Sequence, residues 1–241
     1  PAPGSGDAVF CLMTNMITDG SLAGETTCLP FYIFNADGGA PRENISGAAL
    51  ARFQDHYGDT RLNRWDIFYY IYGLLHLPAH QERMAEDLLY QAPRIPLVGS
   101  SSDFWTISEA GSRLAALHLN FDAGKRYSLK LQQDGISTFT FRVEKMTLDK
   151  ERAALRFNES ITLGDVPSET FAYRLGKWSA LEWLIDQYRI SADSRSGIIA
   201  DPNAFKHERY IISLVERIVH LSVETVRIVQ DLQKHLPQGA R

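Results

Sequence analysis

The chain contains few cysteines and no long apolar run. Only Cys11 and Cys28 occur among its 241 residues, without the CxxC spacing or neighbouring histidines of a zinc site. Two cysteines do not make a disulfide framework, so we expect both to be small buried residues in a reducing cytoplasm. No stretch approaches the roughly 20 apolar residues of a membrane span. We therefore expect neither a zinc-stabilised, nor a disulfide-rich, nor a membrane-bound protein.

The short motifs of catalysis and nucleotide binding are also missing. GxGxxG, GxxxxGK[ST], HExxH and GxSxG do not occur, and no His, Asp or Glu set has metal-ligand spacing. Asp201-Pro202-Asn203 follows no predicted strand and lacks the aromatic residue that would stack on a flipped base. We therefore expect this stretch of chain to perform no chemistry and to hold no cofactor or metal.

The composition is that of an ordinary globular protein, with 44% hydrophobic and 22% charged residues. A net charge of −4 argues against a freely basic nucleic-acid binder. Residues 125–156, however, hold eight Lys and Arg against four Asp and Glu, a local surplus of four. That surplus fits a surface that follows phosphates, and it fits equally the exposed face of a sheet.

The spacing of apolar residues predicts an α+β fold with a helical N-terminal half, a β-rich centre, a capped helix and a long C-terminal helix. Alternating residues between 127 and 162, such as those from Phe139 to Glu144, predict strands. Turns are expected at residues 132–135 and 149–150. Two further strands are expected at Ala8–Met16 and Thr27–Phe34, followed by a loop at 35–44. The expected helices are 46–57, 66–75 after a cap at Asn63, 78–90, one led by a capping box of Thr106 and Glu109, and 206–236.

The segment from Tyr173 to Asn203 combines a capped amphipathic helix with many basic and aromatic residues. Ser179 begins a capping box, and the apolar residues behind it lie on one helix face. Arg174, Lys177 and Arg189 flank this helix. The pattern fits a helix packed on a core with a solvated cationic rim, and it fits a helix whose basic flanks meet phosphate.

This segment, YRLGKWSALEWLIDQY followed by SRSGIIADPN, resembles the C-terminal specificity domain of Type ISP restriction–modification enzymes. Two further blocks, Asp66–Leu97 and Phe104–Phe121, match in the same order. Such enzymes join a nuclease, a helicase-like ATP-driven translocase, an N6-adenine methyltransferase and a target-recognition domain. The resemblance implies that this chain is the last of these. Its partners would be double-stranded DNA and the methyltransferase and helicase-like domains, while S-adenosylmethionine, ATP and Mg would be bound elsewhere in the parent.

The resemblance also sets the expected domains. Residues 1–45 would form a strand pair and a loop at the edge of a preceding methyltransferase domain. Residues 46–241 would form the target-recognition domain, with a helical tail at 205–236. The whole would lie in a prokaryotic cytoplasm.

Reading a sequence requires side chains that reach base edges in the major groove. Two other interpretations remain open: a protein-interaction or assembly module without DNA contact, and an enzyme whose site carries no familiar motif. Salt-dependent affinity for DNA would separate the first of these from recognition. Chosen by chemistry, the base-reading candidates are Lys125, Arg126, Lys130, Gln132, Gln133 and Arg142. The phosphate candidates are Arg174, Lys177, Arg189, Arg195 and Lys206.

Overall fold

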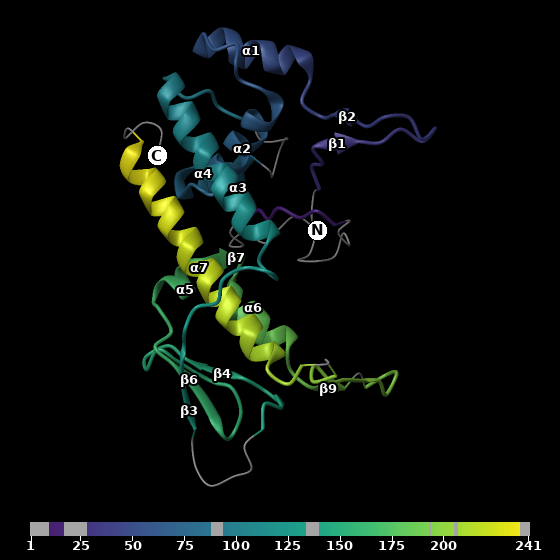
Figure 1. Ribbon diagram of the computed structural model, residues 1–241, viewed down its shortest axis with the longest axis vertical. Helices are drawn as coiled ribbons and strands as arrows, with labels where there is room; N and C mark the ends of the chain where they lie inside the picture. Colours follow the sequence, from purple (N-terminus) through teal and green to yellow (C-terminus); the bar gives the residue numbers. More distant parts are fainter. Residues whose placement is uncertain are drawn as a thin grey trace. The chain divides into compact units, whose positions relative to one another are not determined.

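The computed structural model mixes helices with small antiparallel sheets and ends in a long helix (Figure 1), which confirms the α+β prediction. Two compact units are present, one formed by residues 1–119 with 228–241 and the other by 120–227. The expected boundary near residue 45 concerns a different division, between parts of a parent enzyme, and stays a prediction. The structure describes residues 10–16, 28–87, 94–133, 140–192, 194–204 and 207–236, with the side chains of 84–87 excepted.

The first unit is mainly helical, and local caps explain where two of its helices begin. The hydroxyl oxygen of Ser46 accepts a hydrogen bond from the N–H of Ala49, and Gly58, with a φ of +62°, ends the same helix. Asn63 and Asp66 form the predicted reciprocal capping box. The helices are α1 (Gly47–Tyr57), α2 (Arg64–Leu74), α3 (Pro78–Asp87) and α4 (Ser101–Leu119).

The start of α4 differs from the predicted one. The capping box expected at Thr106 is wrong, because α4 begins at Ser101 and Thr106 lies inside it. The Ser100 side chain accepts the N–H of Asp103 at 3.0 Å, so the cap lies upstream. Thr106 instead donates its hydroxyl to the carbonyl of Ser102, as helical threonines do. Ser100 therefore caps the helix, and Ser101 and Ser102 belong to its first turn.

Helices α2 and α4 approach so closely that their backbones touch. A Cβ placed on Gly111 would lie 1.9 Å from the carbonyl oxygen of Tyr69, and one on Gly73 would lie 2.5 Å from the carbonyl oxygen of Ile107. Beside this crossing, the rings of Tyr70 and Phe104 stack with centroids 4.9 Å apart, and both are fully buried. The aromatic residues of α2 therefore include core members.

The first 45 residues contain a strand pair, but not the predicted one. The described part of Ala8–Met16 has no strand. Instead, β1 (Tyr32–Ile33), within the predicted strand Thr27–Phe34, pairs with β2 (Arg42–Glu43), which lies in the stretch expected to be a loop. Phe31, just before β1, stacks on Trp65 of α2 with ring centroids 3.7 Å apart. Packing against a helix outside the segment therefore favours this pairing, and the local apolar pattern could not reveal it.

A cluster of histidines is buried in the first unit. His118 lies in the core, with its Nδ1 2.6 Å from the hydroxyl oxygen of Tyr72. The Nδ1 atom of His76 lies 2.8 Å from the backbone oxygen of Tyr72 and 3.6 Å from the sulfur of Cys11. Cys28, in contrast, is exposed, so the prediction that both cysteines are buried is wrong for it.

This cluster makes stability depend on pH. Burial, aided by the charge of His76, lowers the pKa of His118 to about 3, against about 6.5 in an unfolded chain. Since the folded pKa is depressed, this stabilisation is complete above pH 6.5 and is lost as the pH falls from 6.5 towards 3. We expect His118 to account for a loss of about 2 kcal/mol at pH 5.

Urea unfolding of the wild type and His118→Gln at pH 7, 6 and 5 measures this loss. Glutamine can accept the hydroxyl of Tyr72 but does not titrate. The wild-type stability should therefore fall more steeply than that of the variant. Equal slopes would show that folding does not lower the pKa of His118.

The second unit contains a four-stranded antiparallel sheet in the order β3-β6-β5-β4. The turn predicted at residues 149–150 does join β4 to β5. The first strand, β3, pairs with the distant β6, whereas the pattern predicted a turn at residues 132–135 into a neighbouring strand. The strands are β3 (Lys130–Gln133), β4 (Thr147–Asp149), β5 (Ala154–Arg156) and β6 (Ile161–Gly164).

The alternating stretch from Phe139 to Glu144 is not a strand in its described part. Two asparagine side chains bind its backbone instead of a neighbouring strand. Asn158 donates to the carbonyls of Thr140 and Arg142, at 2.8 and 2.9 Å. Asn203 accepts the N–H of Val143 and donates to its carbonyl. Because these polar groups are satisfied by side chains, the segment needs no ladder partner.

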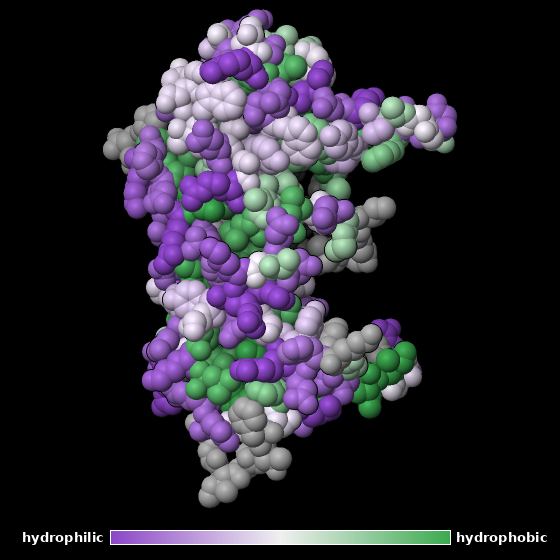
Figure 2. Space-filling view, in the orientation of Figure 1, coloured by the Kyte–Doolittle hydropathy of each residue, from purple (hydrophilic) through white to green (hydrophobic). Residues whose placement is uncertain are grey.

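The capped helix α6 (Ala180–Gln187) follows the prediction, with a reciprocal capping box between Ser179 and Glu182 and with Leu181 and Leu184 buried. Beyond it, a hairpin exposes Ile198 at its turn, and Figure 2 shows apolar surface at the end of this hairpin. The remaining short elements are α5 (Glu169–Ala172), β7 (Arg174–Leu175), β8 (Trp178–Ser179), β9 (Ser191–Ala192) and β10 (Ile199–Ala200).

The long C-terminal helix, α7 (Tyr210–His235), begins four residues later than predicted. Its apolar positions are core residues: Val215 and Val219 belong to the core of the second unit, and Ile228 and Leu232 to that of the first. Among the described residues, no helix combines the length and apolar character that a membrane span requires.

Candidate nucleic-acid interface

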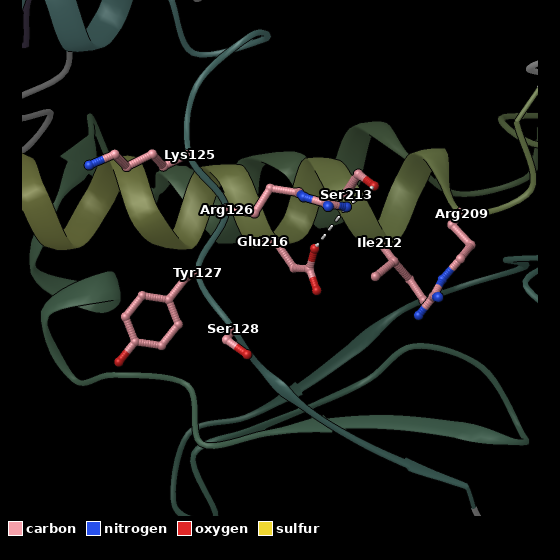
Figure 3. Close-up of a pocket in the computed structure, with 8 residues that line it drawn as sticks. All are labelled: Lys125, Arg126, Tyr127, Ser128, Arg209, Ile212, Ser213 and Glu216. Atoms are coloured by element: carbon pink, nitrogen blue, oxygen red, sulfur yellow. Dashed lines mark hydrogen bonds and ion pairs between the residues drawn. The ribbon is translucent and has the colours of Figure 1, made fainter.

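A groove of about 530 Å³ lies in the second unit between residues 125–128 and the first turns of α7 (Figure 3). Lys125 and Arg126 line it from the extended segment, and Arg209 and Glu216 line it from the helix side. Three cations thus share the groove with one carboxylate. Such a balance suits a phosphate oxygen better than a neutral ligand.

Two contacts fix the positions of residues that line this groove. The N–H of Tyr127 donates to the backbone oxygen of Glu216 at 2.9 Å, which fastens the extended segment to α7. Helical spacing of three or four residues then brings Arg209, Ser213 and Glu216 to the same face. The guanidinium of Arg209 lies 5.0 Å from the centroid of the Phe141 ring, a cation–π contact that orients it.

The charges within the groove are coupled. Arg126 donates a hydrogen bond to the Ser213 hydroxyl at 3.3 Å and lies 3.7 Å from the Glu216 carboxylate. Burial raises the pKa of Glu216, and the positive charges of Arg126, Arg209 and Arg217 act in the opposite direction. The carboxylate is therefore held in an environment that disfavours its charge and depends on nearby guanidinium groups.

The chain runs from the groove directly into β3, the edge strand of the sheet. Residues directly opposite each other in an antiparallel pair lie on the same face of the sheet. The pairing register therefore shows which face each β3 side chain occupies. Gln133 lies opposite the fully buried Ile161, whereas Gln132 lies opposite Thr162, which in turn lies opposite Arg156 of β5. Gln132, Thr162 and Arg156 therefore form a polar row across three strands, on the face away from the core.

Lys130 belongs to the same outer face, opposite Gly164. A Cβ at Gly164 would lie 3.3 Å from the amide nitrogen of Gln132, so the glycine leaves room for that side chain. This face thus offers an amine, an amide, a hydroxyl and a guanidinium, the groups that read base edges.

The other sequence candidates lie apart from this row. Arg142 pairs with Asp201 at 2.9 Å. Arg174 and Lys177 are exposed at the β7–β8 turn, where Arg174 donates to the Lys177 carbonyl.

Three phosphate candidates remain. Arg189 pairs with Asp186 at 3.3 Å at the end of α6. Arg195 is exposed between β9 and β10, and Lys206 lies outside the described residues.

The structure therefore joins four base-reading candidates, Lys125, Arg126, Lys130 and Gln132, along one exposed stretch. It adds two residues that sequence reasoning did not choose, Arg209 and Arg156. Alternation with the apolar Leu155 indicated that Arg156 faces outward, whereas no local signal placed Arg209 beside residues more than 80 positions earlier.

Comparison with known proteins gives a consistent result. A model of the Type ISP C-terminal specificity domain matches residues 2–216. A nuclease-deletion mutant of the Type ISP restriction–modification enzyme LlaGI, in complex with a DNA substrate mimic, is 30% identical with a TM-score of 0.74; the match covers 95% of this chain and 20% of that one. No curated protein matches.

Two further solved structures agree. A DrdV–DNA complex is 32% identical with a TM-score of 0.81, covering 94% of this chain and 23% of that one. The ATP-dependent Type ISP restriction–modification enzyme LlaBIII, bound to DNA, is 28% identical with a TM-score of 0.69, covering 83% and 13%. This chain therefore spans less than a quarter of the length of each of these three proteins.

Proposed function

Because the chain belongs to the family of Type ISP C-terminal specificity domains, we propose that it holds duplex DNA and reads its sequence for an adjoining methyltransferase and translocase. The observation that carries this proposal is the outer sheet face with Lys130, Gln132 and Arg156, continuous in the chain with a cationic groove. DNA in the complexes of three similar proteins supports the same ligand.

The groove and the outer sheet face would have different roles in DNA binding. Lys125 and Arg126, chosen from the sequence as base readers, would instead bind phosphates together with Arg209, because they line the groove. Phosphate contacts fix the register of the protein on the duplex but carry no sequence information. Gln132 and its neighbours on the sheet would reach base edges in the major groove, where a glutamine amide can pair with adenine. Arg174, Lys177, Arg189, Arg195 and Lys206 remain proposed phosphate contacts at other loops.

The parent polypeptide would supply the chemistry. A methyltransferase must extrude its target base, so a separate part has to hold the neighbouring duplex. In this proposal the parent is a cytoplasmic N6-adenine methyltransferase and ATP-dependent restriction endonuclease that binds S-adenosylmethionine, ATP and Mg outside this chain. The described residues offer no group of three or more His, Cys, Asp or Glu side chains suited to a metal.

The adjacent pair Gln132 and Gln133 provides a matched test of base reading. Duplexes are first selected from a random pool, and the ratio of specific to random affinity is then measured by fluorescence anisotropy. Gln132→Ala should lower this ratio by about 5- to 150-fold, since one good base contact contributes ~1–3 kcal/mol. Gln133→Ala should change it less than twofold, because Gln133 lies on the opposite face of β3.

The alternative, an assembly module without direct DNA contact, is supported by the net charge of −4. It predicts that neither glutamine affects DNA binding and that affinity does not vary with salt. Equal losses from both glutamines would argue against the proposed reading face while leaving DNA binding in place.

A further inference from the structure

The groove is lined by one carboxylate, that of Glu216. Glu216 points from α7 toward Arg126, with the carboxylate 3.7 Å from the guanidinium (Figure 3). The hydrogen bond from Tyr127 to the Glu216 backbone fixes the helix residue opposite the extended segment. Only 20% of the Glu216 side chain is exposed, compared with 59% for Arg126. The acid is therefore held in place, while the arginine is accessible to a ligand.

A carboxylate at this position is more than a solvated surface charge. It lies against Arg126 on one side and receives favourable interactions from Arg209 and Arg217. Burial raises the pKa of Glu216, and the positive charges of these guanidinium groups act in the opposite direction, so they favour the carboxylate form. In the free protein Glu216 thus acts as the counter-ion of the groove.

We propose that Glu216 occupies the place of a DNA phosphate in the free protein and thereby weakens sequence-independent binding at this groove; this inference rests on the proposed function. For Arg126 to bind a phosphate, it must give up the Glu216 carboxylate, which then also repels the incoming anion. Both effects reduce the phosphate contribution to affinity. Because this contribution is independent of sequence, a duplex that offers no base contacts is bound weakly.

The test compares two acids in the full chain. Glu216→Gln should bind a random-sequence duplex about 3- to 10-fold more tightly at fixed salt, equivalent to about 0.7–1.4 kcal/mol. Glu208→Gln is the control, because it removes the same charge from an exposed acid adjacent to Arg209 in the chain. The control should change affinity less than twofold if Glu216 acts by direct contact rather than by long-range charge.

A double-mutant cycle with Arg126→Ala tests whether Glu216 acts through Arg126. The gain from Glu216→Gln should become smaller when Arg126 is absent, because the competition for its guanidinium is gone and only the repulsion of the phosphate remains. An equal gain in both backgrounds, or weaker binding by Glu216→Gln, would overturn the proposal. If the wild type binds DNA but Glu216→Gln gives no gain in affinity, only the proposal for Glu216 is overturned. If the wild type binds no duplex at all, the proposed function is overturned as well.

Discussion

Replacing Gly111 with alanine is expected to lower the free energy of unfolding by about 3 kcal/mol, near the upper end of what overpacking costs. The added methyl carbon would lie 1.9 Å from the Tyr69 oxygen, 2.7 Å from the Tyr69 carbonyl carbon and 2.9 Å from the Gly73 nitrogen. All three are backbone atoms, so no side chain can rotate away. The two helices must separate, which loosens the packing around Tyr70 and Phe104. Since small proteins are stable by only 5–15 kcal/mol, the loss is a large share.

Gly47→Ala is the matched control, because Gly47 is the first residue of α1 and its added Cβ would meet only the Arg64 side chain, at 4.0 Å. Alanine favours a helix more than glycine, so this variant should be neutral or slightly more stable. Urea unfolding followed by circular dichroism measures both. If Gly111→Ala were as stable as Gly47→Ala, α2 and α4 could not be in backbone contact.

The sequence could predict those features that are determined within one helical turn. The capping boxes at Asn63 and Ser179 were predicted correctly, because each depends on a residue and its third neighbour. The same reasoning failed at Thr106, where a valid local pattern lay inside a helix that had already begun at Ser101. A capping motif shows that a helix can start at a residue but not that an upstream start is absent.

Long-range pairing could not be predicted. The strand β3 joins β6 about 30 residues later, and Asn203 binds the backbone of Val143 in place of a strand. Alternation of apolar residues at 139–144 is compatible with either outcome, since both bury the same side chains. Only the three-dimensional partners decide where the backbone hydrogen bonds go.

At the candidate site, too, local features could be predicted from the sequence and long-range contacts could not. The sequence directed attention to residues 125–133, since amines, guanidinium groups and amides are abundant there. It could not distinguish Gln132 from Gln133, because the face of each depends on the register of β3 with β6. Nor could it find Arg209, which reaches the groove only because Tyr127 is bonded to α7. Residue type suggested a function, and register and helix docking selected the residues.

Removing the three groove cations together, as Lys125→Ala, Arg126→Ala and Arg209→Ala, is expected to weaken binding of any duplex by roughly 100-fold at 150 mM salt. Each phosphate contact contributes about 0.9 to the slope of log affinity against log salt, so the slope should become shallower by about 2 to 3. The ratio of specific to random affinity should change little, because in the proposed function these residues bind phosphates and not bases. Fluorescence anisotropy over a salt series measures both quantities.

The control for this variant removes the same total charge from cations that are neutralised locally: Arg152, Arg227 and Lys234, each paired with an acid three residues away. Exposed pairs of this kind contribute little, and each leaves behind an unpaired acid. If the two triple variants lost affinity and slope equally, net charge alone would explain binding, and the groove would have no special role. A shallower slope confined to the groove variant would instead show that phosphates lie against Lys125, Arg126 and Arg209. The Glu216 carboxylate would then be the one groove charge that the DNA must overcome.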